Sequence, residues 1–245
     1  MLKQMFSSIK PDMYDRLNRV ATLSLDQLWR HLAAKEILRD NPEKILDLCC
    51  GTGDLTVAIA KKIVLRNIAV PGTKMVVGAD YCEPFLTYAE EKTQKSRGLI
   101  NQTPTFLQFV EADAANLPFD DNTFDAVGIS FAFRNLTYQN PNSGKHLSEI
   151  LRVLKPSGKF VFVETSQPRN LIIRKLFHLY MRIIPVIAGT LLGQSRSAYS
   201  YFAGSTINFF TKEVAVELLE NAGFSVEKFK PFMFGAVALV IAKKI

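Results

Sequence analysis

The sequence has little cysteine and no segment that would carry it through a membrane. Its 245 residues include three cysteines, Cys49, Cys50 and Cys82, and no C-x-x-C pair. This small, odd number argues against a disulfide framework or a zinc site and favours a reducing compartment. No stretch reaches the roughly 18 uncharged apolar residues that a spanning helix needs, and the N-terminus lacks the apolar core of a signal peptide. We therefore expect a cytoplasmic protein without a bound metal.

Linkers, repeats and low-complexity tracts are also missing. No Pro-, Gly- or Ser-rich segment divides the chain, and 48% of its residues are hydrophobic. A chain of this length and composition fits one α/β domain with a sizeable core. We predict a single domain over residues 1–245.

The charge is unbalanced towards the basic side. Lys and Arg number 30 against 23 Asp and Glu, a net charge of +7, and the pI is near 9.3. A basic surface attracts the phosphates of nucleic acids, lipid headgroups or small anions, and charge alone does not choose among them. An RNA-binding protein would interleave basic residues with exposed aromatic ones or carry an appended binding module. Neither pattern is present, so we expect no nucleic-acid partner.

Short apolar runs alternate with helical patterns along most of the chain. Such runs are typical of a parallel sheet covered on both faces by helices. The predicted strands cover residues 44–48, 74–79, 105–110, 124–130 and 159–165, and the predicted helices 54–65, 83–95 and 143–154. A helix at 211–222 then precedes strands at 224–232 and 234–243, whose tight connection requires an antiparallel pair. The predicted fold is α/β, a seven-stranded, mostly parallel sheet that ends in an antiparallel hairpin.

A glycine-containing turn follows the first strand and opens the first helix. It contains Gly51, Thr52 and Gly53, and the glycines permit backbone angles and a close ligand approach that a Cβ would block. Free backbone N–H groups at the helix start could receive a ligand carboxylate, and Asp47 could accept a bond from a cationic amine. A dinucleotide-binding fold has a third glycine at the position where this chain has Thr56. The missing glycine counts against NAD or FAD as the ligand of this turn.

Polar residues also end the next three strands. Asp80 could accept bonds from both hydroxyls of a ribose, or it could simply cap the following helix. Asp113 and Ala114 begin a loop that would flank an adenine, with Asp113 accepting from the exocyclic amine. Ser130 ends the fourth strand. Ligands bind at the carboxyl ends of such strands, so these residues should surround one nucleoside.

Four further segments resemble the menaquinone/ubiquinone biosynthesis C-methyltransferases, and the resemblance runs from Met5 almost to the C-terminus. They are Met5–Ile9 with Tyr14, Asp15, Asn18, Ser24 and Trp29–Arg30; Ser130–Asn135; Arg152–Pro156 with Glu164, Ser166 and Pro168; and Tyr199–Phe202 with Ser205 and Phe209. The chain departs from the family pattern at Asn116, Ala132 and Ser157. These departures put only the fine shape of the acceptor pocket in doubt.

The resemblance implies a class I S-adenosylmethionine-dependent methyltransferase fold and a polyprenylated quinol as acceptor. It places donor contacts on Thr52, Asp80, Asp113, Ala114 and Ser130. The implied reaction is C-methylation of demethylmenaquinol, and methylation of a ubiquinone precursor is the alternative. A small-molecule or RNA methyltransferase of the same fold, or a binding module without activity, would be other interpretations. The intact glycine turn and Asp80 argue against the last of these.

Methylation at a quinol carbon needs a base, or a cation that stabilises the phenolate. We predict that Arg134 supplies the cation and that Asn135 holds a quinol oxygen. Tyr14, with Asp15, would close over the site and exclude water. A surface salt bridge for Arg134 and ordinary packing for Tyr14 are the alternatives. The three histidines, His31, His146 and His178, fall in predicted helices without a visible partner, so the base stays unassigned.

An apolar helix with a basic stripe is predicted at residues 171–184, and Pro185 is expected to end it. Arg174, His178 and Arg182 form the stripe, and the rest is apolar. This pattern fits an interfacial helix, the wall of a prenyl tunnel, or a helix buried against the sheet edge. We expect peripheral binding to the inner membrane face, with residues 169–210 as an apolar, basic insertion for the lipid and residues 1–42 as a helical cap over the site.

Overall fold

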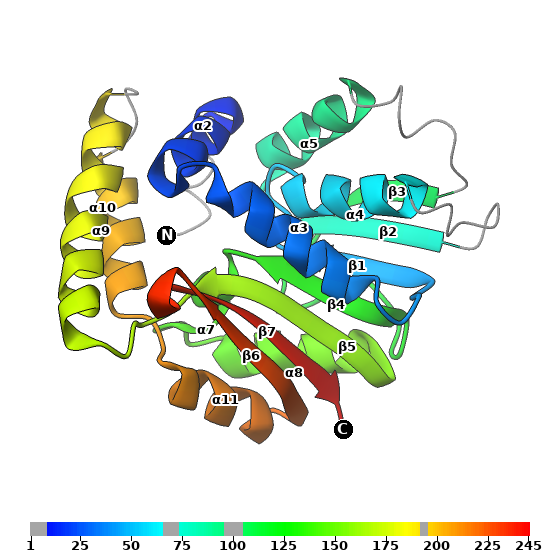
Figure 1. Cartoon of the computed structure of the whole chain (residues 1–245). Helices are drawn as coiled ribbons and strands as arrows, with labels where there is room; N and C mark the ends of the chain where they lie inside the picture. Colours follow the sequence, from blue (N-terminus) through cyan, green and yellow to red (C-terminus); the bar gives the residue numbers. More distant parts are fainter. Residues whose placement is uncertain (1–8, 66–73, 96–104, 192–195) are drawn as a thin grey trace.

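A seven-stranded sheet forms the centre of the computed structural model, which describes residues 9–65, 74–95, 105–191 and 196–245 (Figure 1). The strand order is β3-β2-β1-β4-β5-β7-β6. The strands are β1 Lys44–Leu48, β2 Lys74–Asp80, β3 Thr105–Glu111, β4 Phe124–Ser130, β5 Leu154–Thr165, β6 Phe224–Phe232 and β7 Val237–Lys244. All neighbours from β3 to β5 pair in parallel, whereas β7 is antiparallel to both β5 and β6. The predicted fold is therefore confirmed.

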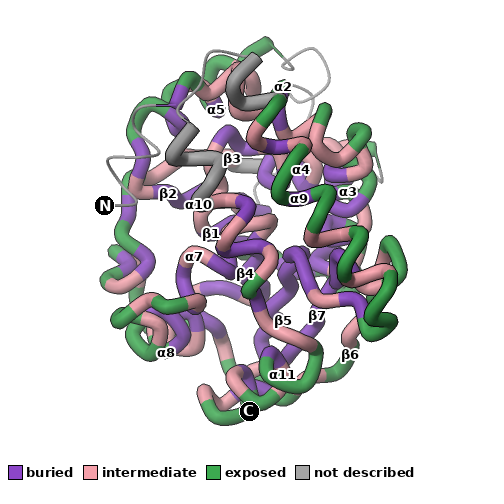
Figure 2. Tube along the Cα trace, turned by 90° about the vertical axis from the view of Figure 1, so that its left-hand side faces the viewer, coloured by how far each residue is buried: buried purple, intermediate pink, exposed green. Residues whose placement is uncertain are grey.

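Helices cover both faces of the sheet (Figure 1). They are α2 Pro11–Thr22, α3 Leu25–Ile37, α4 Asp54–Leu65, α5 Glu83–Lys95, α7 Phe133–Thr137, α8 Ser143–Val153, α9 Leu171–Leu191, α10 Arg196–Ile207 and α11 Lys212–Asn221, with a 3-10 turn, η1, at Met233–Gly235. Alternation along each strand sends successive side chains to opposite faces. In β1, Ile45 joins the core under α3 and α4, and Leu46 joins the core under α8 and α11. Figure 2 shows the strands buried between these layers.

The same period-two alternation fixes the direction of Asp47. This residue shares its face with Ile45, so its carboxyl group turns away from the α8 layer and towards α3 and α4. Two residues, Cys49 and Cys50, separate the end of β1 from the glycine turn. The backbone at Cys49, Gly51 and Gly53 has positive φ angles of 55°, 53° and 76°. The chain thus reverses sharply at the carboxyl end of β1, as the glycines predicted.

Three predicted boundaries differ from the structure by more than one residue. The fifth strand begins at Leu154, five residues before its predicted start at residue 159, because the chain is extended from the end of α8 through Pro156. Pro185 does not end the long helix, because α9 continues through it to Leu191. A proline inside a helix removes one backbone hydrogen bond and kinks or strains the turn before it, yet the surrounding apolar residues can keep the helix going. The last strand begins at Val237 rather than at residue 234, because η1 occupies the connection.

The insertion between β5 and α11 forms a pair of packed helices, α9 and α10, beside the N-terminal α2 (Figure 1). The outer face of α9 is exposed and apolar, and its stripe includes Ile172, Leu176, Leu179 and Ile183. Tyr180 also ties α9 to the N-terminal cap, since its hydroxyl donates to the carbonyl of Ala21 at 2.7 Å. None of the helices that the structure describes is long and apolar enough to cross a membrane.

Candidate active site

A cavity of about 1300 Å³ opens at the carboxyl ends of β1 to β4. Residues that directly follow these strands line it, and so do residues of α2, α3, α8 and α10. Eight of the eleven predicted site residues line the cavity: Tyr14, Gly51, Thr52, Asp80, Asp113, Ala114, Ser130 and Asn135. Asp47, Gly53 and Arg134 are not among its lining residues. Ligand pockets span roughly 300–1,000 Å³, so this cavity has room for two molecules.

Asp80 is held rigidly at the end of β2. Its Oδ2 accepts from the amide of Gly51 at 2.9 Å, and its Oδ1 accepts from the amide of Cys82 at 2.9 Å. Burial raises the pKa of this carboxyl group, and the bonds from backbone amides oppose the rise. Each carboxylate oxygen keeps a lone pair that a pair of vicinal hydroxyls could use.

The two glycines of the turn serve different purposes. Gly51 has a φ of +53°, and a Cβ built on it would meet nothing within 4 Å, so its backbone faces the open cavity. A Cβ on Gly53 would lie 2.9 Å from the Cβ of Ala89 and 3.2 Å from the ring of Phe109. Gly53 therefore allows α4 to pack closely against α5 and β3, and Gly51 allows the close approach of a ligand.

Asp47 lies under the turn rather than in the cavity. Its side chain is fully buried, and its Oδ2 accepts from the hydroxyl of Thr56 at 2.5 Å. Burial raises the pKa of Asp47 to about 7, although the bonds from Thr56 and the charge of Arg30 oppose the rise. Asp47 thus stabilises the start of α4, and its Oδ1 has no hydrogen-bond partner among the described residues. Because Asp47 does not line the cavity, its direct contact with a ligand amine stays a prediction.

The N-terminal cap is fastened to the glycine turn through Asp15. Its Oδ1 accepts from the hydroxyl of Thr52 at 2.6 Å, and its Oδ2 pairs with Lys92 of α5 at 2.7 Å. Lys92 also pairs with Asp54 at 2.8 Å, and Arg19 of the cap pairs with Asp54 at 2.5 Å. Burial alone would raise the pKa of Asp54, but Arg30 and Lys92 reverse the effect and lower it. These pairs hold α2 over the cavity.

Tyr14 lines the cavity from the same helix. Its ring packs on Phe85 of α5 with centroids 5.3 Å apart, and burial raises the pKa of its hydroxyl. The covering role of Tyr14 stays a prediction. Residues 5 to 8 of the N-terminal motif lie outside the described part of the chain, and α10 is described at Tyr199–Tyr201 by its backbone alone.

Ser130 contacts an arginine of the cap. Arg30 donates from Nε to Ser130 Oγ at 3.1 Å, and its Nη1 pairs with the buried Asp26. The guanidinium also lies 5.2 Å from the ring centroid of Phe131. Arg30 is a cavity residue that the sequence analysis did not place in the site, although the Trp29–Arg30 pair belonged to the N-terminal motif.

Arg134 is buried and paired. Its side chain is 3% exposed, and Nη1 donates to Glu164 Oε1 at 2.7 Å while Nε donates to Ser205 Oγ at 3.0 Å. The backbone amide of Arg134 donates to Glu164 Oε2 at 3.0 Å, and the guanidinium lies 4.9 Å from the ring centroid of Phe202. The pair joins α7 and β5 to α10. The salt bridge considered from the sequence is therefore present, but in the interior rather than on the surface.

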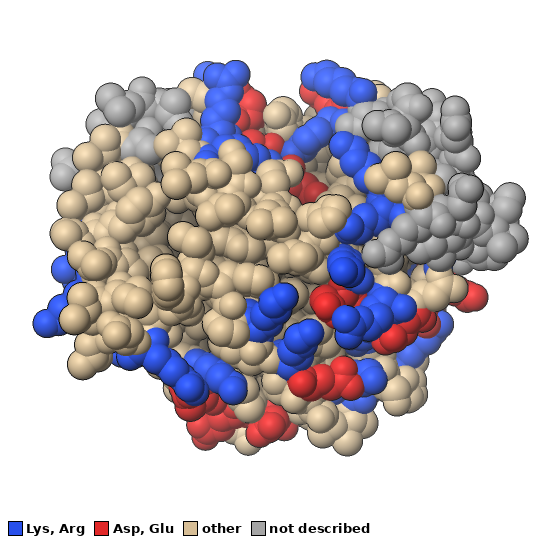
Figure 3. Space-filling view, viewed as in Figure 1, with Lys and Arg blue, Asp and Glu red and all other residues tan. Residues whose placement is uncertain are grey.

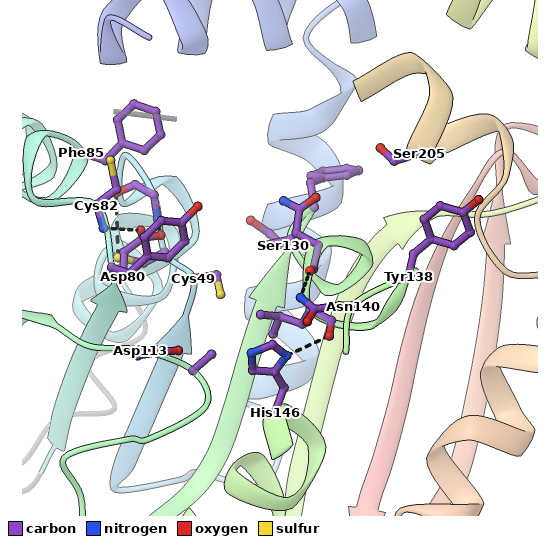
Figure 4. A pocket seen from close by; sticks show the side chains of 18 of the residues that line it. Cys49, Asp80, Cys82, Phe85, Asp113, Ser130, Tyr138, Asn140, His146 and Ser205 are labelled. Atoms are coloured by element: carbon purple, nitrogen blue, oxygen red, sulfur yellow. Dashed lines mark hydrogen bonds between the residues drawn. The ribbon is translucent and has the colours of Figure 1, made fainter. Parts of the chain in front are cut away.

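The half of the cavity away from Asp80 is lined by amides, a histidine and an aromatic ring. Figure 4 shows Asp80, Cys82, Phe85, Cys49 and Asp113 on one side, Ser130 between, and Tyr138, Asn140, His146 and Ser205 on the other. Asn140 donates to the carbonyl of Asn135 at 2.8 Å, and Asn135 Oδ1 is buried without a hydrogen-bond partner among the described residues. The sequence did not identify Tyr138, Asn140 and Ser205 as cavity residues. Ser205 belongs to the fourth family-like segment, whereas no local motif marks Tyr138 or Asn140.

Two cysteines line the half that contains Asp80. Cys49 and Cys50 are partly exposed to the cavity, and burial raises the pKa of both thiols well above the usual value. Both thiols are therefore protonated near neutral pH, which agrees with a packing role. The described residues contain no group of three or more His, Cys, Asp or Glu side chains that could hold a metal ion.

A family model described as the ubiE/COQ5 methyltransferase family matches residues 1–244. The chain belongs to the ubiE/COQ5 methyltransferase family. It is 36% identical to the demethylmenaquinone methyltransferase of Staphylococcus saprophyticus over 94% of this chain and 91% of that protein. It is 35% identical to the demethylmenaquinone methyltransferase of Lactiplantibacillus plantarum over 96% of this chain and 92% of that protein. The chain is thus a methyltransferase of quinone biosynthesis.

Solved structures share the fold with this family member. A magnesium protoporphyrin IX methyltransferase from Synechocystis with bound SAH superimposes with a TM-score of 0.66 at 16% identity, covering 100% of this chain and 98% of that one. A SAM-dependent methyltransferase from Aquifex aeolicus gives a TM-score of 0.56 at 19% identity, covering 86% and 89%. At these identities the likeness concerns the fold alone.

Proposed function

We propose that this protein transfers the methyl group of S-adenosylmethionine to a ring carbon of a polyprenylated quinol, with demethylmenaquinol as the acceptor. The observation that carries the proposal is the divided cavity, in which the Gly51 turn, Asp80 and Asp113 face a second half lined by Asn135 and Asn140. The name of the relatives, demethylmenaquinone methyltransferase, supports the choice of acceptor.

The residues of the first half fit an adenosyl nucleoside. Asp80 presents a carboxylate fixed by two backbone amides, which suits the two ribose hydroxyls. Asp113 Oδ1 accepts from the amide of Ala115 at 2.9 Å, so the carboxylate is oriented and Oδ2 can accept from an exocyclic amine. The open face of Gly51 suits the aminoacyl end of the donor. Arg30 supplies a cation there, with no hydrogen-bond partner for its Nη2 among the described residues.

When bound, the donor would supply an electrophilic methyl group. The protein must then hold the acceptor carbon in line with it, exclude water and take up a proton. We assign Asn135 to holding a quinol oxygen and Tyr14, with α2, to covering the site, because both residues line the cavity. Arg134 is paired with Glu164, so its positive charge is already neutralised and can do little to stabilise a phenolate. We therefore assign Arg134 to holding α7, and with it Asn135, in place.

The test of this function is a direct assay with the purified protein. Anaerobically reduced demethylmenaquinol with a short prenyl chain and S-adenosylmethionine should give a product heavier by one methylene group, detected by mass spectrometry. Quinone profiling in a strain that lacks the protein should show the accumulating precursor. Accumulation of a ubiquinone precursor instead would transfer the proposal to that acceptor, and accumulation of neither would refute it.

We further propose that the protein draws this acceptor from an anionic membrane, which it contacts peripherally through the outer face of α9. Leu176 and Leu179 are 61% and 54% exposed on this face, and Phe234 of η1, beside the start of α9, is 81% exposed. Figure 3 shows a broad surface without charged side chains, with Lys and Arg at its edges. Each basic residue near an anionic surface contributes about 1 kcal/mol of attraction. A basic margin around an apolar face is the pattern of an interfacial helix.

Flotation with liposomes tests the membrane contact. Wild type should float with vesicles that contain 30% phosphatidylglycerol at low salt, and the double variant Leu176→Asp, Leu179→Asp should remain at the bottom. The matched control is Val214→Asp on α11, where an apolar side chain is also exposed. Equal flotation of all three proteins would exclude α9 as the contact. Failure of the wild type to float would exclude the membrane proposal and leave the reaction untouched.

A further inference from the structure

One histidine of the fold reaches the acceptor half of the cavity. His146 lies in the first half of α8 and is 5% exposed, and the small exposed part faces the cavity. Its Nδ1 lies 2.8 Å from the carbonyl oxygen of Leu136 in α7. A carbonyl only accepts, so Nδ1 carries the proton and Nε2 carries a lone pair. Figure 4 shows the ring beside Asn140, with its other nitrogen turned towards the middle of the cavity.

We infer that His146 is the base that accepts the proton of the acceptor's ring hydroxyl. The inference rests on the proposed function, since it names the proton acceptor for that reaction. A neutral imidazole with one nitrogen fixed by a backbone carbonyl and the other open to the site is a common acid–base arrangement in enzymes. No hydrogen-bond partner for Nε2 exists among the described residues.

Other groups in the cavity are less suited to take this proton. Burial raises the pKa of Cys49 and Cys50, so these thiols already carry a proton near neutral pH. Asp80 is engaged by two backbone amides, and Asp54 is paired with Arg19 and Lys92. These carboxylates also belong to the half of the cavity that suits the donor.

The step balances without a further reactant. The hydroxyl proton moves to His146 Nε2, and the electron pair of the oxygen activates the adjacent ring carbon. A bond forms between that carbon and the methyl group while the methyl–sulfur bond breaks, and sulfur keeps the electron pair. The methylated carbon then loses its hydrogen as a proton to solvent, and the imidazolium returns its proton to the ring oxygen. One proton is released for each methyl group transferred.

Charged groups around His146 bear on its pH dependence. On its own helix, Glu149 and Arg152 are 2.7 Å apart and paired. From α7, Arg134 is paired with Glu164, and across the cavity Glu111 and Asp113 are acidic.

His146→Asn separates the chemical role from a structural one. The amide nitrogen of asparagine can take the place of Nδ1 and still donate to the Leu136 carbonyl, but the side chain has no base. General acid–base catalysis typically contributes 10²–10⁴-fold, so the single-turnover rate of methyl transfer should fall by about 100-fold or more. Donor affinity, measured by calorimetry with S-adenosylhomocysteine, should stay within about 3-fold of wild type. The acidic limb of the rate–pH profile should vanish.

A second variant and a control make the outcome decisive. Added imidazole should partly restore transfer by His146→Gly, and the exposed His31→Gln should behave like wild type. The inference is overturned if His146→Asn transfers methyl at nearly the wild-type rate or keeps the acidic limb. A loss of donor affinity as large as the loss of rate would instead assign His146 to the donor half. A wild type that binds donor but never methylates the quinol would refute the proposed function, not the placement of His146.

Discussion

Replacing the buried Asp47 by asparagine should change how the stability of the protein depends on pH. The carboxyl group is fully buried and bonded to Thr56, and its pKa is raised from 3.8 to about 7. Because the folded state prefers the protonated form, the stability from this group is fully present below pH 3.8 and is lost as the pH rises through 7. A difference of about three pKa units corresponds to about 4 kcal/mol in total.

Over the range that an experiment can use, the effect is smaller. Between pH 5 and pH 8, linkage gives the wild type a loss of about 2.5 kcal/mol from this one group. Asparagine has nearly the same shape, keeps an oxygen for the Thr56 hydroxyl and cannot ionise. The free energy of unfolding of Asp47→Asn, minus that of the wild type, should therefore grow by about 2.5 kcal/mol from pH 5 to pH 8.

Urea unfolding of the ligand-free proteins at pH 5, 6.5 and 8 measures this difference. Asp125→Asn is the control. Burial raises the pKa of Asp125, but Lys155 and hydrogen bonds from backbone amides lower it by more, so the pKa lies below its usual value. That group stays ionised throughout the range, so its variant should differ from wild type by a constant amount. A constant difference for Asp47→Asn as well would show that Asp47 is already ionised in the folded protein at pH 5, and the reasoning from its burial would be wrong.

Three further predictions concern the site. Asp80→Ala should weaken S-adenosylhomocysteine binding by about 10- to 100-fold in calorimetry, since charge-assisted hydrogen bonds contribute about 1.5–3 kcal/mol; unchanged affinity would remove Asp80 from the site. Arg134→Ala should lower turnover far more than donor affinity. It should also lower the free energy of unfolding by about 3–5 kcal/mol, because Glu164 is left buried without a partner. In urea unfolding, the double variant Arg134→Met, Glu164→Gln should recover much of that loss, and no recovery would mean that the pair does not act as a unit. Asp15→Ala removes the contacts to Thr52 and Lys92, so amides of α2 should exchange faster with deuterium, whereas unchanged protection would show that the cap is held by other contacts.

The order of strands and helices, and the edge of the sheet that holds the site, were predictable from the sequence. Three of the predicted apolar strands end at or shortly before a polar residue, namely Asp80, Asp113 and Ser130. In parallel strands joined by helices, these ends must lie along one edge of the sheet. Local signals were therefore enough to predict that the residues proposed for the donor lie close together. The local signal at Pro185 was misleading, because packing on α10 and the surrounding apolar residues keep α9 helical.

Only the tertiary structure decided which side chains face the cavity and which are paired elsewhere. Arg134 meets Glu164 thirty positions along the chain, and Arg30 meets Ser130 one hundred positions along it. The proton on His146 Nδ1 depends on a carbonyl of a different helix, and the direction of Asp47 depends on which face of the sheet α4 covers. Such pairings depend on burial and on the direction of side chains after packing. The sequence supplies the residue types, but not the distances that decide whether an arginine meets a substrate or a buried carboxylate.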